Sequence, residues 1–200
     1  MDELPKSNVG KILRRELRDV TPAAPVQKQV EETAKVTTTD KPAAKKAAPK
    51  TYSTTTMQDF IGKEFGPSKP MLVNQIRINT FADCTEDHQW IHVHPEMAKK
   101  HSPFGGTVAH GFLVLSMLAG SIYDVGIIPK DAKGVLNYGT EKVRFLMPVL
   151  VNSEVVNSYK LIGVEEKGKD RLLARVEATT TVKGMPKPAV VAEILAMIVC

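Results

Sequence analysis

The chain has 200 residues, which suits one domain of ordinary size plus an accessory segment. Residues 1–50 carry eleven basic and seven acidic side chains, which leaves sixteen basic and fifteen acidic side chains for residues 51–200. The folded part is therefore close to neutral, and nothing in its charge suggests a nucleic-acid partner. No apolar run is long enough to span a bilayer and no signal peptide is recognisable, so we expect a cytoplasmic protein without a membrane span.

The composition divides the chain into three segments. Residues 1–19 contain the motif LPKSNVGKILRRELRD, and residues 20–56 are rich in Ala, Pro, Thr and Lys. The second segment cannot bury enough apolar surface to offset its ordering entropy, so it is predicted to be a disordered linker. Residues 57–200 are predicted to form the folded domain. Cys84 and Cys200 are far apart and are expected to be free thiols.

The first half of the domain is predicted to end in a buried helix. Residues 71–80 are interpreted as a first strand, and residues 81–107 as short helical turns and loops. Apolar side chains surround the axis of a helix predicted over residues 109–125 rather than forming one stripe. We therefore expect this helix to be covered on most sides.

The second half of the domain is predicted to consist of strands that follow one another as hairpins. The strand-like segments are residues 143–147, 155–164, 171–182 and 189–199, separated by turn residues at 152–153, 167–170 and 183–186. The last segment is apolar on both faces, as expected of a central or interface-covered strand. The predicted fold is α+β, with one long helix wrapped by a curved antiparallel sheet.

A polar stretch precedes the predicted buried helix and contains the candidate catalytic side chains. Asp87 and His92 are five residues apart in a predicted loop. If a carboxylate and an imidazole converge, they can hold one water molecule between them, and histidine titrates close to neutral pH. Taken alone, these two residues are better explained by loop capping and surface solvation.

The segment FGGTVAHG, residues 104–111, leads into the same helix. Glycines let the backbone approach a ligand closely, and the first amides of a helix have no internal acceptor. The amide near Gly111 could therefore donate to a carbonyl oxygen that gains negative charge during a reaction. The alternative is a plain helix start whose glycines serve packing.

Together these motifs resemble a known family. Asp87-x4-His92, FGG and AHG resemble the signature of the MaoC-like (R)-specific enoyl-CoA hydratases, and the wording ADCTEDHQWIHVHPE, FGGTVAHGFLVLS and LNYGTEKVRFLMPV resembles their NodN-like branch. The resemblance covers residues 57–200. It implies a hot-dog fold, a homodimer, and an acyl-CoA substrate bound in a tunnel that the partner subunit helps to complete. It also implies that Asp87 and His92 are the catalytic pair and that the backbone near Gly111 is the oxyanion hole.

The sequence departs from the commoner hydratase loop, which has Asn-Pro between the aspartate and the histidine. Here residues 88–91 read HQWI, and His94 stands where an aspartate is usual. His88, His94, His101 and His110 suggest a metal cluster, but their spacing lacks the pairs of common zinc sites. We therefore predict neither a metal nor a cofactor, with the CoA thioester as substrate.

The N-terminal segment carries a second, shorter resemblance. The motif in residues 1–19 resembles the C-terminal motif of AMP-forming acyl-CoA synthetases, in which Lys11 would contact the acyl-adenylate. The adenylate-binding body is missing from this chain, so the segment is interpreted as a remnant of such an enzyme.

The leading hypothesis is a hydratase that converts trans-2-enoyl-CoA to 3-hydroxyacyl-CoA, with the R product implied by the family alone. A hot-dog acyl-CoA thioesterase remains an alternative, in which a carboxylate directs water at the carbonyl carbon. A noncatalytic acyl-CoA-binding protein is the third possibility.

Overall fold

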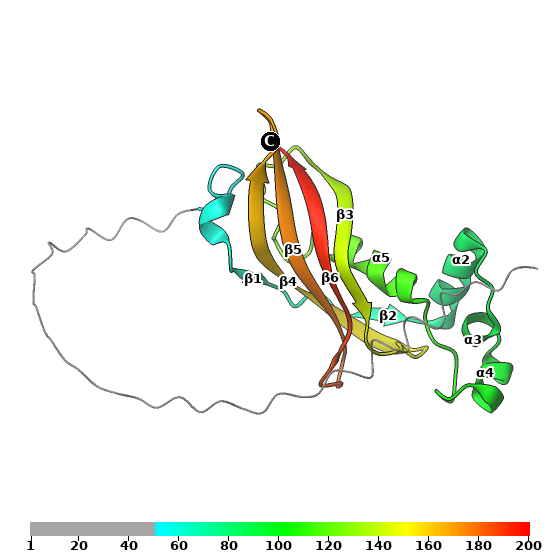
Figure 1. Ribbon diagram of the computed structural model, residues 1–200. Coiled ribbons are helices and arrows are strands. Elements are labelled where there is room, and N and C mark those ends of the chain that lie inside the picture. The colour runs from blue at the N-terminus through cyan, green and yellow to red at the C-terminus, as the bar shows by residue number, and fades with distance from the viewer. Residues whose placement is uncertain (1–50) are drawn as a thin grey trace, which may run out of the picture. The chain divides into compact units, whose positions relative to one another are not determined.

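The computed structural model describes residues 51–200 (Figure 1). The elements in chain order are η1 (Met57–Phe60), β1 (Glu64–Phe65), β2 (Met71–Val73), α2 (Gln75–Thr85), α3 (Trp90–Val93), α4 (Pro95–His101), α5 (Gly111–Ser121), β3 (Gly134–Phe145), β4 (Ser153–Glu166), β5 (Arg171–Val182) and β6 (Pro188–Val199). The synthetase-like motif with Lys11 and the predicted linker up to residue 50 lie outside the described residues.

The sheet is antiparallel, with strand order β1-β4-β5-β6-β3 and β2 also paired to β4. Figure 1 shows its long strands bending together, which confirms the predicted curved sheet. The predicted hairpin succession is wrong at β3, which pairs with β6 rather than with β4. Strand β6 therefore has a hydrogen-bonded neighbour at each edge, β5 on one side and β3 on the other. The prediction that the last strand is central is therefore confirmed.

The predicted first strand over residues 71–80 is largely wrong. Only Met71–Val73 forms a strand, and helix α2 begins directly after Asn74. The Asn74 side chain accepts a hydrogen bond from the Arg77 amide at 2.9 Å, which is a typical N-cap interaction. Ile78 and Ala82 are four residues apart and fully buried, as one face of a helix requires.

Helix α5 is shorter than predicted, and it is not covered on most sides. Its buried side chains are Leu113, Val114, Met117, Leu118 and Ser121. Leu118 packs in a core cluster with the sheet, whereas Leu113 packs in a second cluster that includes Ile78 of α2. Phe112, however, is 67% exposed. The single chain therefore leaves one side of this helix open.

A buried polar contact joins the C-terminal end of α5 to the sheet. The Tyr159 hydroxyl of β4 donates to the Leu118 carbonyl at 2.8 Å and contacts the Ser121 hydroxyl. Burial raises the pKa of Tyr159 to about 12, so the phenol keeps its proton at neutral pH. Because buried polar groups need partners, these bonds favour one placement of the helix on the sheet.

The folded part begins before residue 57. The Tyr52 ring packs against the core, and its hydroxyl donates to the Ile127 carbonyl at 2.5 Å. The Thr54 hydroxyl donates to Asp131 at 2.7 Å. Residues 51–56, which the sequence assigned to the linker, thus pack on this domain. Within residues 51–200, none of the helices has the length and apolar character needed to cross a bilayer.

Candidate active site

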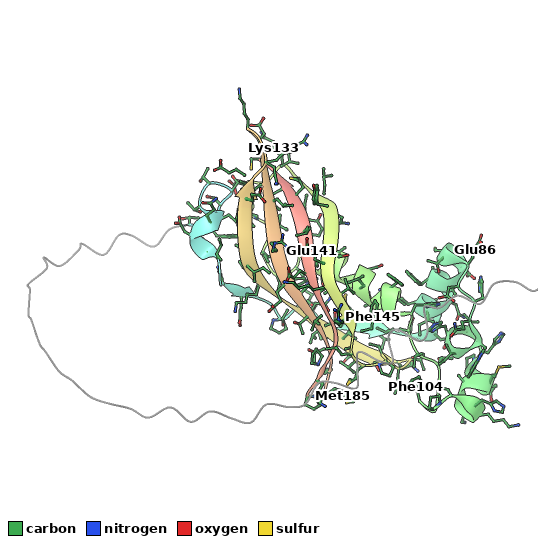
Figure 2. All side chains as sticks on the ribbon, in the orientation of Figure 1. Glu86, Phe104, Lys133, Glu141, Phe145 and Met185 are labelled. Atoms are coloured by element: carbon green, nitrogen blue, oxygen red, sulfur yellow. The ribbon has the colours of Figure 1, made fainter. Side chains whose placement is uncertain are left out.

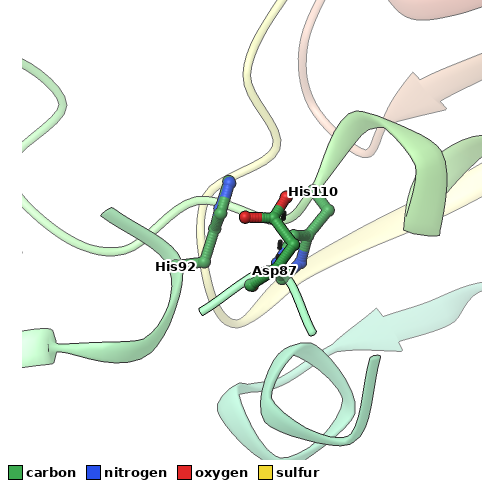
Figure 3. A group of neighbouring side chains, drawn as sticks. All are labelled: Asp87, His92 and His110. Atoms are coloured by element: carbon green, nitrogen blue, oxygen red, sulfur yellow. Dashed lines mark hydrogen bonds and ion pairs between the residues drawn. The ribbon is translucent and has the colours of Figure 1, made fainter. Parts of the chain in front are cut away.

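Three side chains from separate segments meet beside the N-terminus of α5. Helix α2 ends at Thr85, and Glu86 in the left-handed conformation (φ 61°) turns the chain into the loop that carries Asp87. His92 lies on the short helix α3, and His110 immediately precedes α5. One polar atom of each of the three side chains lies within 4.8 Å of one from each of the others (Figure 3). The structure therefore brings the predicted pair Asp87 and His92 together.

The imidazole of His92 is held at one nitrogen and open at the other. Its Nδ1 donates to the Val108 carbonyl at 2.7 Å, because a carbonyl oxygen can only accept. The Gln75 side chain donates to the His92 carbonyl at 2.7 Å and accepts from the Thr107 hydroxyl at 2.6 Å. Both the backbone and the ring of His92 are thus fixed, and its Nε2 is left to accept a hydrogen bond.

The surroundings of His92 keep it neutral. Burial lowers the pKa of its imidazole below the usual value of 6.5, and the nearby His110 lowers it further. The bond to the Val108 carbonyl and the charge of Asp87 act in the opposite direction without cancelling the effect of burial. At neutral pH the Nε2 lone pair is therefore available to a water molecule.

Asp87 combines an open carboxylate with a fixed backbone. Its side chain is 53% exposed, and one carboxylate oxygen lies 4.0 Å from Nε2 of His110. The same His110 nitrogen donates to the backbone carbonyl of Asp87 at 2.9 Å. A water about 2.8 Å from each of two atoms can join atoms up to roughly 5.5 Å apart. The spacing between Asp87 and His92 therefore suits one shared water.

Gly111 is the first residue of α5, and its amide has no intrahelical acceptor. A Cβ atom at this position would lie 2.9 Å from the ring of Phe145, so the close packing of this side chain favours glycine. Phe145 lies at the end of β3 beside the start of α5 (Figure 2). A cavity of about 200 Å³ adjoins this point and is lined by Gly111, Phe145, Val114 and other apolar neighbours, but not by Asp87 or His92.

The histidines that suggested a metal cluster do not converge. His88, His94 and His101 are exposed, and only His110 joins the site. The rings of His92 and His110 stack with centroids 3.8 Å apart and planes at 29°. Imidazole lone pairs lie in the ring plane, so stacked rings do not direct both at one ion. This geometry gives His110 a place in the site that the sequence reasoning missed. The available signal was its position directly before Gly111.

Comparisons with known proteins assign the family. A family model described as the MaoC like domain matches residues 56–183. Nodulation protein N of Rhizobium leguminosarum bv. viciae is 42% identical over 140 residues, which are 69% of this chain and 86% of that protein. The 3-hydroxyacyl-thioester dehydratase Z of Mycobacterium tuberculosis is 45% identical over 132 residues, covering 66% and 86%. The chain therefore belongs to the MaoC-like dehydratase family.

Solved structures place the same domain in the hot-dog fold. The monoamine oxidase regulatory protein of Archaeoglobus fulgidus superposes with a TM-score of 0.61 at 26% identity, covering 70% of this chain and 90% of that one. The (R)-hydratase of A. caviae involved in PHA biosynthesis has a TM-score of 0.55 at 22% identity, covering 68% and 94%, and it supports the fold alone. The predicted fold class and family are thus confirmed, and the family indicates a lyase-type enzyme.

Proposed function

We propose that this domain adds water reversibly to the double bond of a trans-2-enoyl-CoA and forms a 3-hydroxyacyl-CoA of R configuration. The observation that carries the proposal is the spacing of Asp87 and His92, whose polar atoms lie within 4.8 Å of each other. The name of the mycobacterial relative, a 3-hydroxyacyl-thioester dehydratase, supports the substrate class. The R configuration rests on the family resemblance.

In the proposed mechanism, one water molecule bridges the two catalytic side chains. The Asp87 carboxylate takes a proton from this water as its oxygen attacks the β-carbon of the enoyl group. Nε2 of His92 accepts the second hydrogen of the same water and orients it. The proton taken up by the pair is then returned to the α-carbon, so that the net change is the addition of one water.

The negative charge that builds on the thioester oxygen requires a donor. We propose the amide of Gly111 for this role, because the first amides of α5 carry the positive end of the helix dipole. A single donor of this kind typically contributes about 3–4 kcal/mol to lowering a barrier. The apolar cavity beside Gly111 offers room for the acyl group next to that donor.

We further propose that the active form is a homodimer. Strand β3 pairs only on its β6 side within the described residues, and Leu136 and Tyr138 of β3 are exposed. A cavity of about 380 Å³ opens between this strand and α5. A second copy that covered this edge would bury the apolar side chains and close the cavity into a tunnel. A CoA substrate and the free Cys84 and Cys200 fit a cytoplasmic location.

The test is hydration of crotonyl-CoA by the full-length chain and by Asp87→Asn. We expect the variant to lose about 10²–10⁴-fold in kcat, because an amide cannot take the proton from water. Asp83→Asn is the matched control, since Asp83 is an exposed neighbouring carboxylate whose only described contact is with His88 at 3.8 Å.

The outcomes separate the three functional hypotheses. Unchanged turnover in Asp87→Asn contradicts the proposed role of this residue. Release of free CoA from saturated acyl-CoA, without hydration, identifies a thioesterase. Tight acyl-CoA binding by the unmodified chain without any turnover identifies a noncatalytic binding protein.

A further inference from the structure

We propose that His110 is a positioning residue that holds Asp87 and His92 at the spacing required for a shared water. The inference rests on the hydration proposed above. Three contacts of one buried imidazole carry it: a hydrogen bond to Asp87, a stack against His92, and an aromatic contact with Phe81.

The first contact fixes Asp87. This residue lies in the loop between α2 and α3, and its carboxylate makes no hydrogen bond of its own within residues 51–200. The backbone carbonyl of Asp87 accepts from Nε2 of His110 at 2.9 Å, across 23 residues of sequence. His110 is only 3% exposed, so this donor belongs to the rigid interior. The exposed carboxylate is therefore anchored to the core through the His110 side chain.

The second contact fixes the ring of His92. Its Nδ1 is held by the Val108 carbonyl, and its face lies against His110 with ring centroids 3.8 Å apart. The His110 ring also contacts the ring of Phe81, with ring centroids 5.2 Å apart. A hydrogen bond in the ring plane and a stack on the ring face together leave the His92 imidazole little freedom to rotate. The orientation of the His92 ring relative to Asp87 is consequently fixed.

The unpaired nitrogen of His110 argues against a role in packing alone. Its Nδ1 is buried and has no hydrogen-bond partner in the described part of the chain. An unpaired buried polar atom is unfavourable, and phenylalanine would fill this space without one. What histidine adds over phenylalanine is the Nε2 donor to Asp87, which is the group that the proposed positioning role requires.

The experiment compares His110→Phe, His110→Gln and the control His101→Phe in the full-length chain. Phenylalanine keeps a ring against His92 but removes the donor, whereas the glutamine side-chain amide can restore a donor at a similar reach. We expect His110→Phe to lower kcat for crotonyl-CoA hydration about 10–100-fold with KM changed less than about threefold, because small displacements of catalytic groups are costly. His110→Gln should recover most of this loss, and His101→Phe, at an exposed position, should match the unmodified chain.

A second readout does not depend on activity. Amide hydrogen exchange at residues 86–89 should become faster in His110→Phe and return toward the original rate in His110→Gln, since the anchor of this loop is lost and then replaced. The pKa of His92, followed by NMR, should rise in both variants because His110 lowers it in the original chain. A general loss of stability would speed exchange across the whole domain, so the expected result is faster exchange confined to residues 86–89.

The outcomes distinguish the two proposals. If the unmodified chain hydrates crotonyl-CoA, and His110→Phe is folded with unchanged kcat and unchanged exchange at residues 86–89, the positioning role of His110 is refuted while the proposed function stands. If the unmodified chain hydrates no enoyl-CoA, the proposed function fails, and the exchange and NMR measurements still decide whether His110 anchors Asp87. If His110→Phe does not fold, His110→Leu, which also lacks the donor, takes its place: unchanged kcat and unchanged exchange at residues 86–89 in that variant would refute the role.

Discussion

Asp87 and His92 have opposite environments, although they face the same small space. The carboxylate is half exposed, and it can exchange a proton or a water with solvent. The imidazole is partly buried, bonded at Nδ1 and stacked on one face, so it has one free acceptor atom and a fixed direction. Such a pair combines a solvent-accessible proton acceptor with a rigid orienting group, which is what the proposed addition of a single water requires.

The lowered pKa of His92 predicts a pH dependence. In the proposed mechanism, protonation of His92 removes the lone pair that accepts the water, so kcat/KM should fall as the pH drops through a value below 6.5 and should be level just above 6.5. The free energy of unfolding should depend on pH in the same direction. Because the pKa of His92 is lowered in the folded state, it contributes stability above pH 6.5 that is lost as the pH falls through the folded-state value.

The measurement is the pH profile of crotonyl-CoA hydration together with an NMR titration that assigns the limb to His92. An acid limb centred above pH 6.5, or a His92 titration that does not coincide with it, would show that another group governs the profile.

Among the elements, helix α2 has the greatest consequence for the site. It replaces most of the strand predicted over residues 71–80, and it positions residues that contact or lead into the site. The helix carries Gln75, which bonds to the His92 carbonyl and to Thr107, and its end projects Asp87. The same helix contributes Ile78 to the core cluster that surrounds the first turns of α5. The placement of Asp87 and His92 therefore depends on where α2 starts.

The N-cap of α2 can be tested directly. Asn74→Ala should lower the free energy of unfolding by about 1 kcal/mol, because the Arg77 amide loses its acceptor. Asn74→Asp keeps an acceptor oxygen and is the matched control, with stability close to that of the original chain. Urea denaturation followed by circular dichroism gives both values. Equal stability of the alanine and aspartate variants would contradict the importance of this cap.

At the scale of the whole molecule, the described domain leaves an edge strand and one side of its helix open. Exposed apolar side chains lie at both places: Phe112 on α5 and Tyr123 just after it, and Leu136 and Tyr138 on β3. The cavity between them is bordered on one side by this free edge. The proposed dimer would account for all of these features with a single interface.

The double variant Leu136→Lys/Tyr138→Lys tests this interface. We expect the original chain to sediment as a dimer and the variant as a monomer with strongly reduced hydration, because charges cannot be buried there without partners. Ile61→Lys, at an exposed apolar position just before β1 and thus at the end of the strand order opposite to β3, should leave the dimer intact. A monomeric original chain with full activity would refute the homodimer.

The sequence alone determined the features that depend on local pattern. The alternation over residues 171–182 coincides with β5, Arg171–Val182, and the doubly apolar run at residues 189–199 identified the central strand β6. Both predictions are confirmed, because side-chain direction in a strand repeats every two residues. The Asp87 and His92 pair and the family also followed from motifs within a short stretch of chain.

Only the tertiary structure decided what depends on contacts between distant segments. Residues 71–80 alternate like a strand, yet capping by Asn74 and burial of Ile78 favour a helix. The pairing of β3 with β6 depends on which sheet edges meet, and the hydrogen bond between His110 and Asp87 joins residues 23 positions apart in the sequence. A local period carries no information about such contacts, since they are selected by packing of the whole domain.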